Sequence, residues 1–563
     1  MTEQDHESFG ERIKQTAART LGTRRWQIVS SAICLGLALL TLLYYITGPA
    51  LGYFHSDCTD SLLWAEASVR SGKVLDEGFA YAALLPFGSP LWMVPLLRLF
   101  GFGYTAHVWS MAVFALLFVA TALFFFRSLR WRYDASSLAT LCLCLLLSGS
   151  VKLREIMWGH VIYYSLGILL LMAMLGTALR LYRSSRLWLT GDRTARSTTT
   201  GVLWAVLLLI LSVGTATDGM QMVSLVTLPV AAALLAYTLC DAKHKLLSRH
   251  TLSALSIVAV MALGTGLGLL LLNVLTQNGA IYAGYENAYS VWSPVSSWWT
   301  NAEQFFKQYI TLMGVQPEKG DPIFAAPSVM LVIRLLGFAV LLIAPLLMLI
   351  QYKHIRHTAS RLVLWAHLAL SFVILFGFVC GTLSGANWRL VPMVGSAILC
   401  TAVYLYELIE RRGVAMRFGV LLTVLLLSVS LSHAVTMLSM PYDYGKDDSM
   451  YDVIDTLDER GYTYGYASFW HASRTAVMSE GRLEVRNVNI QEGTVTPYYY
   501  QTWRDSFEQA EADTYFLLLT ENEAYTLESS SELDRLCKQY GLLDFFTEGE
   551  YVVLVFDRNI FVE

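Results

Sequence analysis

The sequence has few charged residues for its length. Of its 563 residues, 15% are charged and 55% are hydrophobic, whereas about 25% of the residues of a typical soluble domain are charged. This low share of charged residues excludes an ordinary soluble protein. It indicates a polytopic membrane protein that also has a soluble part. The sequence also lacks an outward-facing basic stripe, so we expect no nucleic-acid partner. Its net charge of −4 is too small to favour a partner of either sign.

The sequence also lacks cysteines at the spacings typical of metal-binding or disulfide motifs. The eight cysteines are scattered and form no CxxC pair, which argues against a zinc knuckle or a disulfide framework. We find no internal repeat of the kind that builds transporters from paired halves. The first 25 residues are polar and charged, which does not fit a cleavable signal peptide. We therefore expect residues 1–25 to form a cytoplasmic N-terminus, followed by a first span that directs insertion.

Long apolar runs dominate the region 26–439. A helix needs about 20 apolar residues to cross the hydrocarbon core of a membrane. Eleven runs approach or reach this length, near 26–48, 105–127, 135–151, 159–181, 200–216, 218–239, 253–275, 329–352, 362–385, 389–409 and 417–438. The segment 88–101 is shorter and proline-rich, and we interpret it as a helix at the outer leaflet.

The basic residues predict the orientation of these runs. Five of them precede the first run, and cytoplasmic segments are enriched in Lys and Arg. They are Arg12, Lys14, Arg19, Arg24 and Arg25. If every run crosses once, the later basic clusters fall on the same side as this first one. The prediction is a multi-pass plasma-membrane protein, and the compact loops and absence of organelle signals favour a bacterial source.

Three regions are then expected outside the cytoplasm. The first is the loop at 49–104, and the second is the loop at 277–328. The second loop is rich in aromatic residues, which suit a membrane interface: Tyr282, Tyr285, Tyr289, Trp292, Trp298 and Trp299. The third is the region 440–563, predicted to be a small α/β domain. Its patterns predict helices at 450–461 and 530–540 and strands at 464–469, 515–519 and 551–556.

Polar residues gather at the predicted outer ends of the runs, where ionisable groups suggest function. We expect them to converge on one cavity. They are Asp57 and Asp60 after the first run; Lys152, Arg154, Glu155 and His160 after the third; Asp218 between the fifth and sixth; and Asn387, Trp388 and Arg389 between the ninth and tenth. Arginine recognises phosphate, and a carboxylate accepts a proton from an attacking hydroxyl. The mixture suits a phosphate-linked lipid whose head group is transferred.

These residues also have structural interpretations, which the sequence leaves open. The alternatives are a solvated loop acid or helix N-cap for Asp57 and Asp60, an ion pair between Arg154 and Glu155, a helix cap for Asp218, a packed histidine for His160 and an interface anchor for Arg389.

The region 26–101 resembles one known family. The acids after the first run are followed by Trp64-Ala65-Glu66-Ala67-Ser68-Val69-Arg70-Ser71-Gly72-Lys73, then by Phe87-Gly88-Ser89-Pro90-Leu91-Trp92 and by Leu99-Phe100-Gly101. This order resembles the GT-C superfamily of membrane glycosyltransferases, above all the bacterial protein-mannosyltransferase and aminoarabinose-transferase type. The family commonly has adjacent Asp and Glu in its first loop. Here Cys58 follows Asp57 and Ser61 follows Asp60, so the choice of base between Asp57 and Asp60 stays open.

The resemblance implies a GT-C-like module of about 11 transmembrane helices with a small extracytoplasmic C-terminal α/β domain. It also implies an inverting glycosyltransferase that uses a polyprenyl-phosphate sugar. Asp57 or Asp60 would be the base, and Arg389, with Arg154 or Lys152, would bind the carrier phosphate. Candidate substrate-binding residues are Glu155, Asp218, His160, Trp388 and Asn387.

No cofactor is required by this interpretation, although a divalent metal held by His55 and Asp57 is one candidate. The expected partners are the lipid-linked donor, membrane lipid, and an acceptor that is a glycan, a lipid or a protein. Three alternatives stay open. They are a ligase that transfers a lipid-linked oligosaccharide or polymer, a flippase without bond chemistry, and a surface protein that the spans merely anchor.

Overall fold

The computed structural model describes residues 23–191, 194–241, 248–277, 281–282, 291–317, 320, 322–490 and 493–562. Residues 1–22 of the expected N-terminus, and Tyr285 and Tyr289 of the second loop, lie outside the described residues. Within these ranges, ten helices are long and apolar enough to cross a membrane. They are α2 (Arg24–Thr47), α5 (Tyr104–Ser128), α8 (Tyr163–Leu189), α9 (Ala195–Thr217), the unit of α10 (Met220–Met222), η4 (Val223–Thr227) and α11 (Leu228–Cys240), α12 (Arg249–Thr276), α15 (Ala326–Ile350), α16 (Thr358–Val379), α17 (Val391–Glu410) and α18 (Gly413–Leu438).

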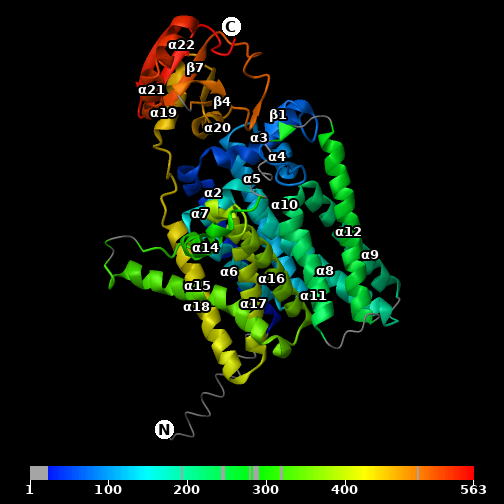
Figure 1. The fold of residues 1–563 in the computed structure, drawn as a ribbon. Coiled ribbons are helices and arrows are strands. Elements are labelled where there is room, and N and C mark those ends of the chain that lie inside the picture. The colour runs from blue at the N-terminus through cyan, green and yellow to red at the C-terminus, as the bar shows by residue number, and fades with distance from the viewer. Residues whose placement is uncertain are drawn as a thin grey trace.

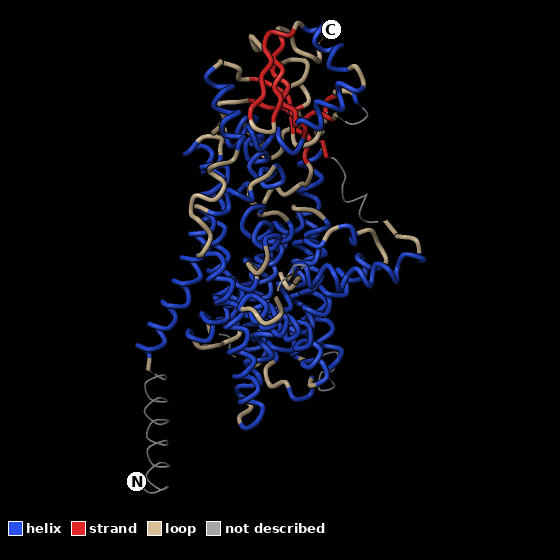
Figure 2. The backbone as a smooth tube through the Cα atoms, turned by 90° about the vertical axis from the view of Figure 1, so that its left-hand side faces the viewer, coloured by secondary structure: helices blue, strands red, loops and turns tan. Residues whose placement is uncertain are grey.

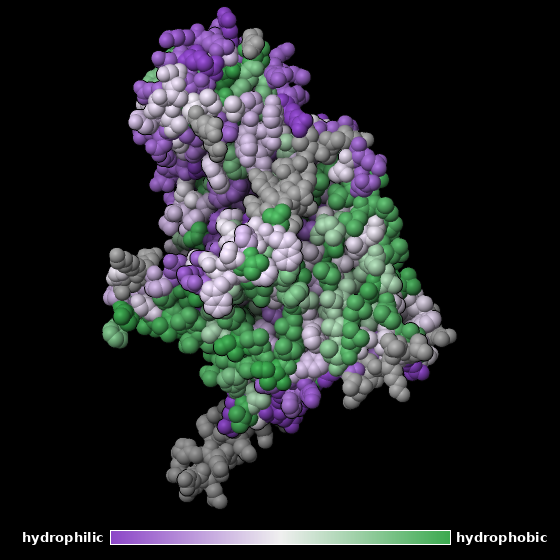
Figure 3. Space-filling view, in the orientation of Figure 1, coloured by the Kyte–Doolittle hydropathy of each residue, from purple (hydrophilic) through white to green (hydrophobic). Residues whose placement is uncertain are grey.

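These helices form a bundle with an apolar outer surface. In Figure 1 the C-terminal region lies at one end of the bundle, and Figure 2 shows most of the strands at that end. Large apolar side chains point outward from α2, where Leu40 is 69% exposed and Ile33 is 62% exposed. On the face seen in Figure 3, a hydrophobic belt crosses the bundle, and hydrophilic residues gather over the C-terminal region. Such a belt suits contact with lipid, and the predicted polytopic helical fold is confirmed.

The third predicted run, 135–151, and the residues that follow it do not form one straight helix. They divide into α6 (Tyr133–Leu146), α7 (Val151–Glu155) and a π-helical turn, η3 (Ile156–His160), with a bend of 114° between α6 and the rest. We call this segment, 133–160, the bent third run. The break follows from its sequence, because Ser150 accepts a hydrogen bond from the Leu153 backbone and caps a new helix there. A serine at an N-cap satisfies backbone donors that would otherwise require a continuing helix. The bend turns the polar residues that follow away from the axis of α6.

The first loop folds into short elements. They are η1 (Pro49–Tyr53), η2 (Ser56–Thr59), α3 (Asp60–Ser71), β1 (Phe79–Tyr81) and α4 (Pro90–Phe100). The helix predicted over the proline-rich segment is therefore present as α4. In the second loop the described elements are β2 (Ile281–Tyr282), η5 (Val295–Ser297) and α14 (Trp298–Leu312). Three further short turns, η6 (Tyr352–His354), η7 (Leu383–Gly385) and η8 (Asn387–Leu390), connect the later helices.

The C-terminal region is a mixed α/β unit, as predicted. Its elements are α19 (Ser449–Glu459), β3 (Tyr464–Ser468), α20 (Phe469–Met478), β4 (Glu484–Asn489), β5 (Thr496–Pro497), β6 (Thr502–Trp503), β7 (Tyr515–Thr520), α21 (Glu521–Ser529), α22 (Glu532–Tyr540), β8 (Leu542–Glu548) and β9 (Tyr551–Phe556). Six strands form one sheet in the order β5-β4-β3-β7-β9-β8. Strands β3, β4 and β7 run parallel, and β9 pairs antiparallel with β7 and β8.

A second, small sheet joins the C-terminal region to the loops of the helical module. Strand β1 pairs antiparallel with β6 and parallel with β2. Beside this sheet, the Trp503 indole donates to Asp76 Oδ2 at 3.0 Å, and the Arg70 guanidinium lies 4.5 Å from the Trp503 ring. These contacts hold the C-terminal region over the first loop.

Candidate active site

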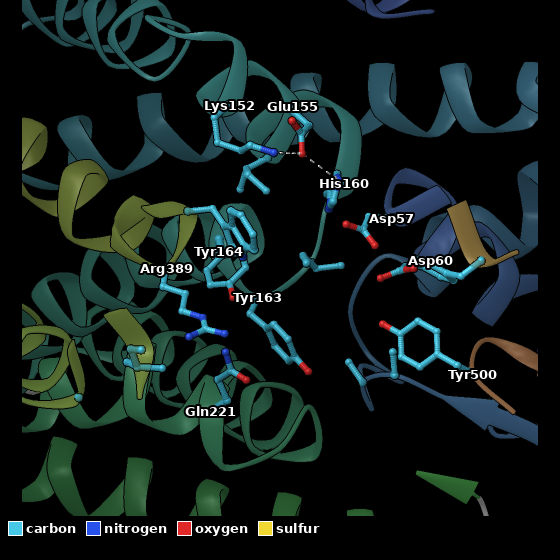
Figure 4. Close-up of a pocket in the computed structure, with 18 of the residues that line it drawn as sticks. Asp57, Asp60, Lys152, Glu155, His160, Tyr163, Tyr164, Gln221, Arg389 and Tyr500 are labelled. Atoms are coloured by element: carbon cyan, nitrogen blue, oxygen red, sulfur yellow. Dashed lines mark hydrogen bonds and ion pairs between the residues drawn. The ribbon is translucent and has the colours of Figure 1, made fainter. Parts of the chain in front are cut away.

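A cavity of about 1440 Å³ lies where the first loop, the bent third run and the C-terminal region meet. Seven residues singled out from the sequence line it: Asp57, Asp60, Lys152, Glu155, His160, Trp388 and Arg389. Figure 4 shows the two aspartates on one side of the cavity and Lys152 and Arg389 on the other. The sequence-based expectation of one shared cavity is met for these seven.

The acidic wall comes from the turn between α2 and α3. Asp57 lies in η2 and is half-buried, whereas Asp60 begins α3 and is only 8% exposed. Neither carboxylate caps α3, because Thr59 is the N-cap residue and no side chain bonds the open backbone donors there. Burial raises the pKa of Asp57, although the nearby His55 charge opposes the shift. Burial and the Asp57 charge together raise the pKa of Asp60 well above its usual range.

The basic wall comes from the bent third run and the segment before α17. Lys152 Nζ lies 2.7 Å from Glu155 Oε1 and 5.1 Å from the centre of the Trp388 ring. Arg389 lies in η8 and donates from one terminal nitrogen to the Thr382 carbonyl at 3.0 Å. Both cations are partly exposed and line the cavity. A cation pair on one wall can bind a phosphate group.

Three of the ten polar candidates at the outer ends of the runs do not line this cavity, and neither does the candidate metal ligand His55. Arg154 is 3% exposed, donates to the Ser148 carbonyl at 3.2 Å and lies 5.7 Å from the Tyr45 ring. It therefore forms no ion pair with Glu155, which pairs with Lys152. Asn387 begins η8 but is not among the lining residues.

Asp218 is the third. Its Oδ1 accepts a hydrogen bond from the Phe87 backbone at 2.8 Å, and burial raises its pKa to about 8. Asp218 lies between α9 and α10 and therefore binds the backbone of the first loop. Its role in binding substrate stays a prediction.

An unusual backbone places His160 beside the first loop. The π-helical turn Ile156–His160 is followed by Val161 in the left-handed region, with φ 44° and ψ 54°. A β-branched residue is strained there, and such strain persists where surrounding contacts enforce it. Here Ser61 Oγ donates to the carbonyls of His160 and Val161, both at 3.3 Å. These contacts fix the turn against the start of α3.

The C-terminal region supplies lining residues that the sequence interpretation missed. Phe469, Trp470, Tyr498 and Tyr500 line the cavity from that side, and Trp470 is 57% exposed. Figure 4 places Tyr500 next to Asp60. The run Tyr498-Tyr499-Tyr500 was a visible signal, but only the fold brings it to the acids.

The arrangement of metal-binding residue types differs from the expected pair. Among the described residues, His55, Cys58 and His160 offer ligand atoms that all lie within 4.8 Å of one another. The sequence paired His55 with Asp57, whereas the fold groups His55 with Cys58 and a histidine from the third run. Burial lowers the pKa of His55, but its contacts with Cys58 and Glu155 outweigh burial and raise the pKa to about 10.

Comparisons with known proteins identify the fold. No protein-family model matches the sequence, and no curated protein matches it. The structure is similar to ArnT from Cupriavidus metallidurans bound to undecaprenyl phosphate, at 15% identity over 95% of this chain and 98% of that chain, with a TM-score of 0.55. It is also similar to ArnT in the apo state, at 13% identity over 94% and 97% of the two chains, with a TM-score of 0.54.

A third similar structure is the oligosaccharyltransferase of Archaeoglobus fulgidus in the apo form. The match has 12% identity over 94% of this chain and 74% of that chain, with a TM-score of 0.49. ArnT, an aminoarabinose transferase, belongs to the GT-C superfamily of membrane glycosyltransferases, so the predicted GT-C fold is confirmed.

Proposed function

We propose that this protein is an inverting glycosyltransferase that moves a sugar from a polyprenyl-phosphate carrier to an acceptor hydroxyl on the extracytoplasmic side of the membrane. The observation that carries the proposal is the cavity with acids on one wall and cations on the other. Support also comes from the fold, because the ArnT structure with the higher TM-score is bound to undecaprenyl phosphate.

The acidic wall provides the base. Asp57 is more exposed to the cavity than Asp60, so we assign the proton transfer to Asp57. The acceptor hydroxyl gives its proton to Asp57 as its oxygen attacks the anomeric carbon from the face opposite the phosphate. A new carbon–oxygen bond forms, and the bond between the anomeric carbon and the phosphate oxygen breaks. The electron pair of that bond leaves with the polyprenyl phosphate.

The basic wall stabilises the leaving group. Negative charge grows on the phosphate during the reaction, and fixed cations in a site with little water stabilise such charge strongly. Arg389 and Lys152 are the cations on that wall. Glu155 holds Lys152 in place through their 2.7 Å contact.

The acids provide a direct test. We expect Asp57→Asn to lower the rate of sugar transfer about 100-fold or more, the scale of general-base catalysis. The matched control is Asp505→Asn, which changes an exposed aspartate of the C-terminal region outside the lining. The assay supplies the full-length protein in detergent with radiolabelled polyprenyl-phosphate hexoses and membrane extract. Full transfer by the Asp57→Asn/Asp60→Asn double variant would overturn the proposal.

A further inference from the structure

Three residues of types that bind transition metals, two histidines and one cysteine, meet between the first loop and the bent third run. His55 is the N-cap residue of one turn, η2, Cys58 lies within that turn, and His160 ends the π-helical turn η3. Their ligand atoms all lie within 4.8 Å of one another. The backbone of η3 packs against Cys58, since a Cβ atom on Gly159 would lie 3.7 Å from the Cys58 sulfur.

Three of the four histidine nitrogens in this group have no hydrogen-bond partner within the described part of the chain. His160 is 4% exposed, and neither of its ring nitrogens has a hydrogen bond. The nearest carboxylate atom to its Nε2 is Glu155 Oε1, at 3.6 Å. His55 Nδ1 is also buried without a hydrogen-bond partner. Buried polar atoms without partners are costly, and a metal ion would satisfy them.

Glu155 lies beside this group, where it can orient His55. Its Oε1 lies 3.1 Å from His55 Nε2, so His55 can donate through Nε2 and bind a metal through Nδ1. Metal-binding histidines commonly donate their second nitrogen to a carboxylate, which fixes the tautomer and the ring orientation. The contact therefore leaves His55 Nδ1 as the nitrogen available to a metal.

We propose that His55, Cys58 and His160 bind one Zn²⁺ ion, with Glu155 orienting His55. Two imidazoles and one thiolate match the donor preference of zinc, and three protein ligands leave a fourth position for water or a carboxylate. Bound zinc would tie η2 to η3 and hold Asp57, which lies between the two ligands of η2, at the edge of the cavity. This site does not depend on the proposed sugar transfer.

Metal content of the full-length protein tests the site. The protein is purified in detergent after growth with zinc, freed of loosely held metal on a chelating resin and measured by elemental analysis. We expect about one zinc per chain in the wild type. Cys58→Ser and His160→Ala should lower this content about tenfold or more. The control Cys537→Ser changes a cysteine of the C-terminal region, away from the group, and should keep the metal.

Cobalt substitution gives a second, spectroscopic readout of the site. Wild-type protein stripped with a chelator and reloaded with Co²⁺ should show a thiolate-to-cobalt charge-transfer band and tetrahedral d–d bands. The band should persist in Cys537→Ser and be absent from Cys58→Ser that elutes as a folded monodisperse protein. Wild-type protein without stoichiometric zinc and without the charge-transfer band would overturn the proposal, as would a folded Cys58→Ser variant that keeps zinc.

Discussion

The Trp64 indole donates a hydrogen bond to Gln501 Oε1 at 2.7 Å, across 437 positions of the chain. Trp64 lies in α3, immediately after the acids of the first loop, and Gln501 lies just before β6 in the C-terminal region. Both side chains are buried, with 3% exposed in each residue. The C-terminal region is therefore bonded to the helix that follows the acids of the candidate site, and it forms part of the structure of that site.

This bond leads to a first prediction. Gln501→Leu keeps much of the side-chain volume but leaves the Trp64 N–H buried without a partner, which costs about 1–3 kcal/mol. We expect a lower thermal unfolding midpoint in detergent, measured by tryptophan fluorescence, together with slower transfer. Gln509→Leu, at an exposed position, is the control. Equal midpoints for the two variants would contradict the role of this bond.

A second prediction concerns the carrier phosphate. Arginine can bond phosphate through two parallel N–H groups, whereas lysine presents a point charge. We expect Arg389→Lys to raise the KM for the lipid-linked donor and to lower kcat, with a combined loss of about 10-fold or more. Arg98→Lys changes an exposed arginine of α4 and should leave both constants unchanged. Donor kinetics equal to wild type in Arg389→Lys would remove Arg389 from the phosphate site.

A third prediction concerns the acceptor. Trp470 lines the cavity from α20 and is 57% exposed, so its ring face is available to pack against an acceptor. We expect Trp470→Ala to raise the KM for the acceptor about 10-fold, equivalent to about 1.4 kcal/mol, while the KM for the donor is unchanged. Tyr525→Ala, at a site 72% exposed on α21, is the control. A rise in the donor KM alone would place Trp470 on the carrier side.

A fourth prediction follows from Asp218, whose pKa burial raises to about 8 from an ordinary value of 3.8. The folded state therefore binds the proton more tightly than the unfolded state, and this contribution to stability is lost as pH rises between these two values. Asp218→Asn keeps a carbonyl acceptor for the Phe87 backbone and does not ionise.

We expect the unfolding midpoint of Asp218→Asn, relative to wild type, to increase from pH 5 to about pH 8 and to level off above that value. Thermal unfolding in detergent at several pH values measures this difference. A difference that is constant with pH would show that Asp218 does not titrate as its burial requires.

Much of the fold could be predicted because the signal is local. A membrane span is a run of apolar residues, so ten of the eleven predicted runs appear as continuous helical units. The third predicted run, 135–151, differs, because its helix α6 ends at Leu146 and the bend that follows has no signal in the apolar pattern. In the C-terminal region the predicted strands include β3, β7 and β9, whose patterns are strongly apolar.

The site was harder to predict because its contacts are distant in the chain. Asp57 and Lys152 were found as polar residues at span ends, whereas Gln501 carries no local sign of its contact with Trp64. Strand β6 has two residues, too few for any periodicity. Arg154 and Glu155 are neighbours in sequence, but they face different surroundings because successive side chains of a helix point about 100° apart. The grouping of Cys58 with His160 depends on the strained turn at Val161.

The stoichiometry of transfer by the purified protein distinguishes sugar transfer from mere movement of the carrier. The donor would carry label in the sugar and in the phosphate, and the assay would measure labelled acceptor, free polyprenyl phosphate and the anomeric configuration of the product. We expect one polyprenyl phosphate released for each sugar transferred, with inversion at the anomeric carbon. Movement of intact donor across a proteoliposome membrane, with no release of polyprenyl phosphate when acceptor is present, would contradict the account and favour a flippase.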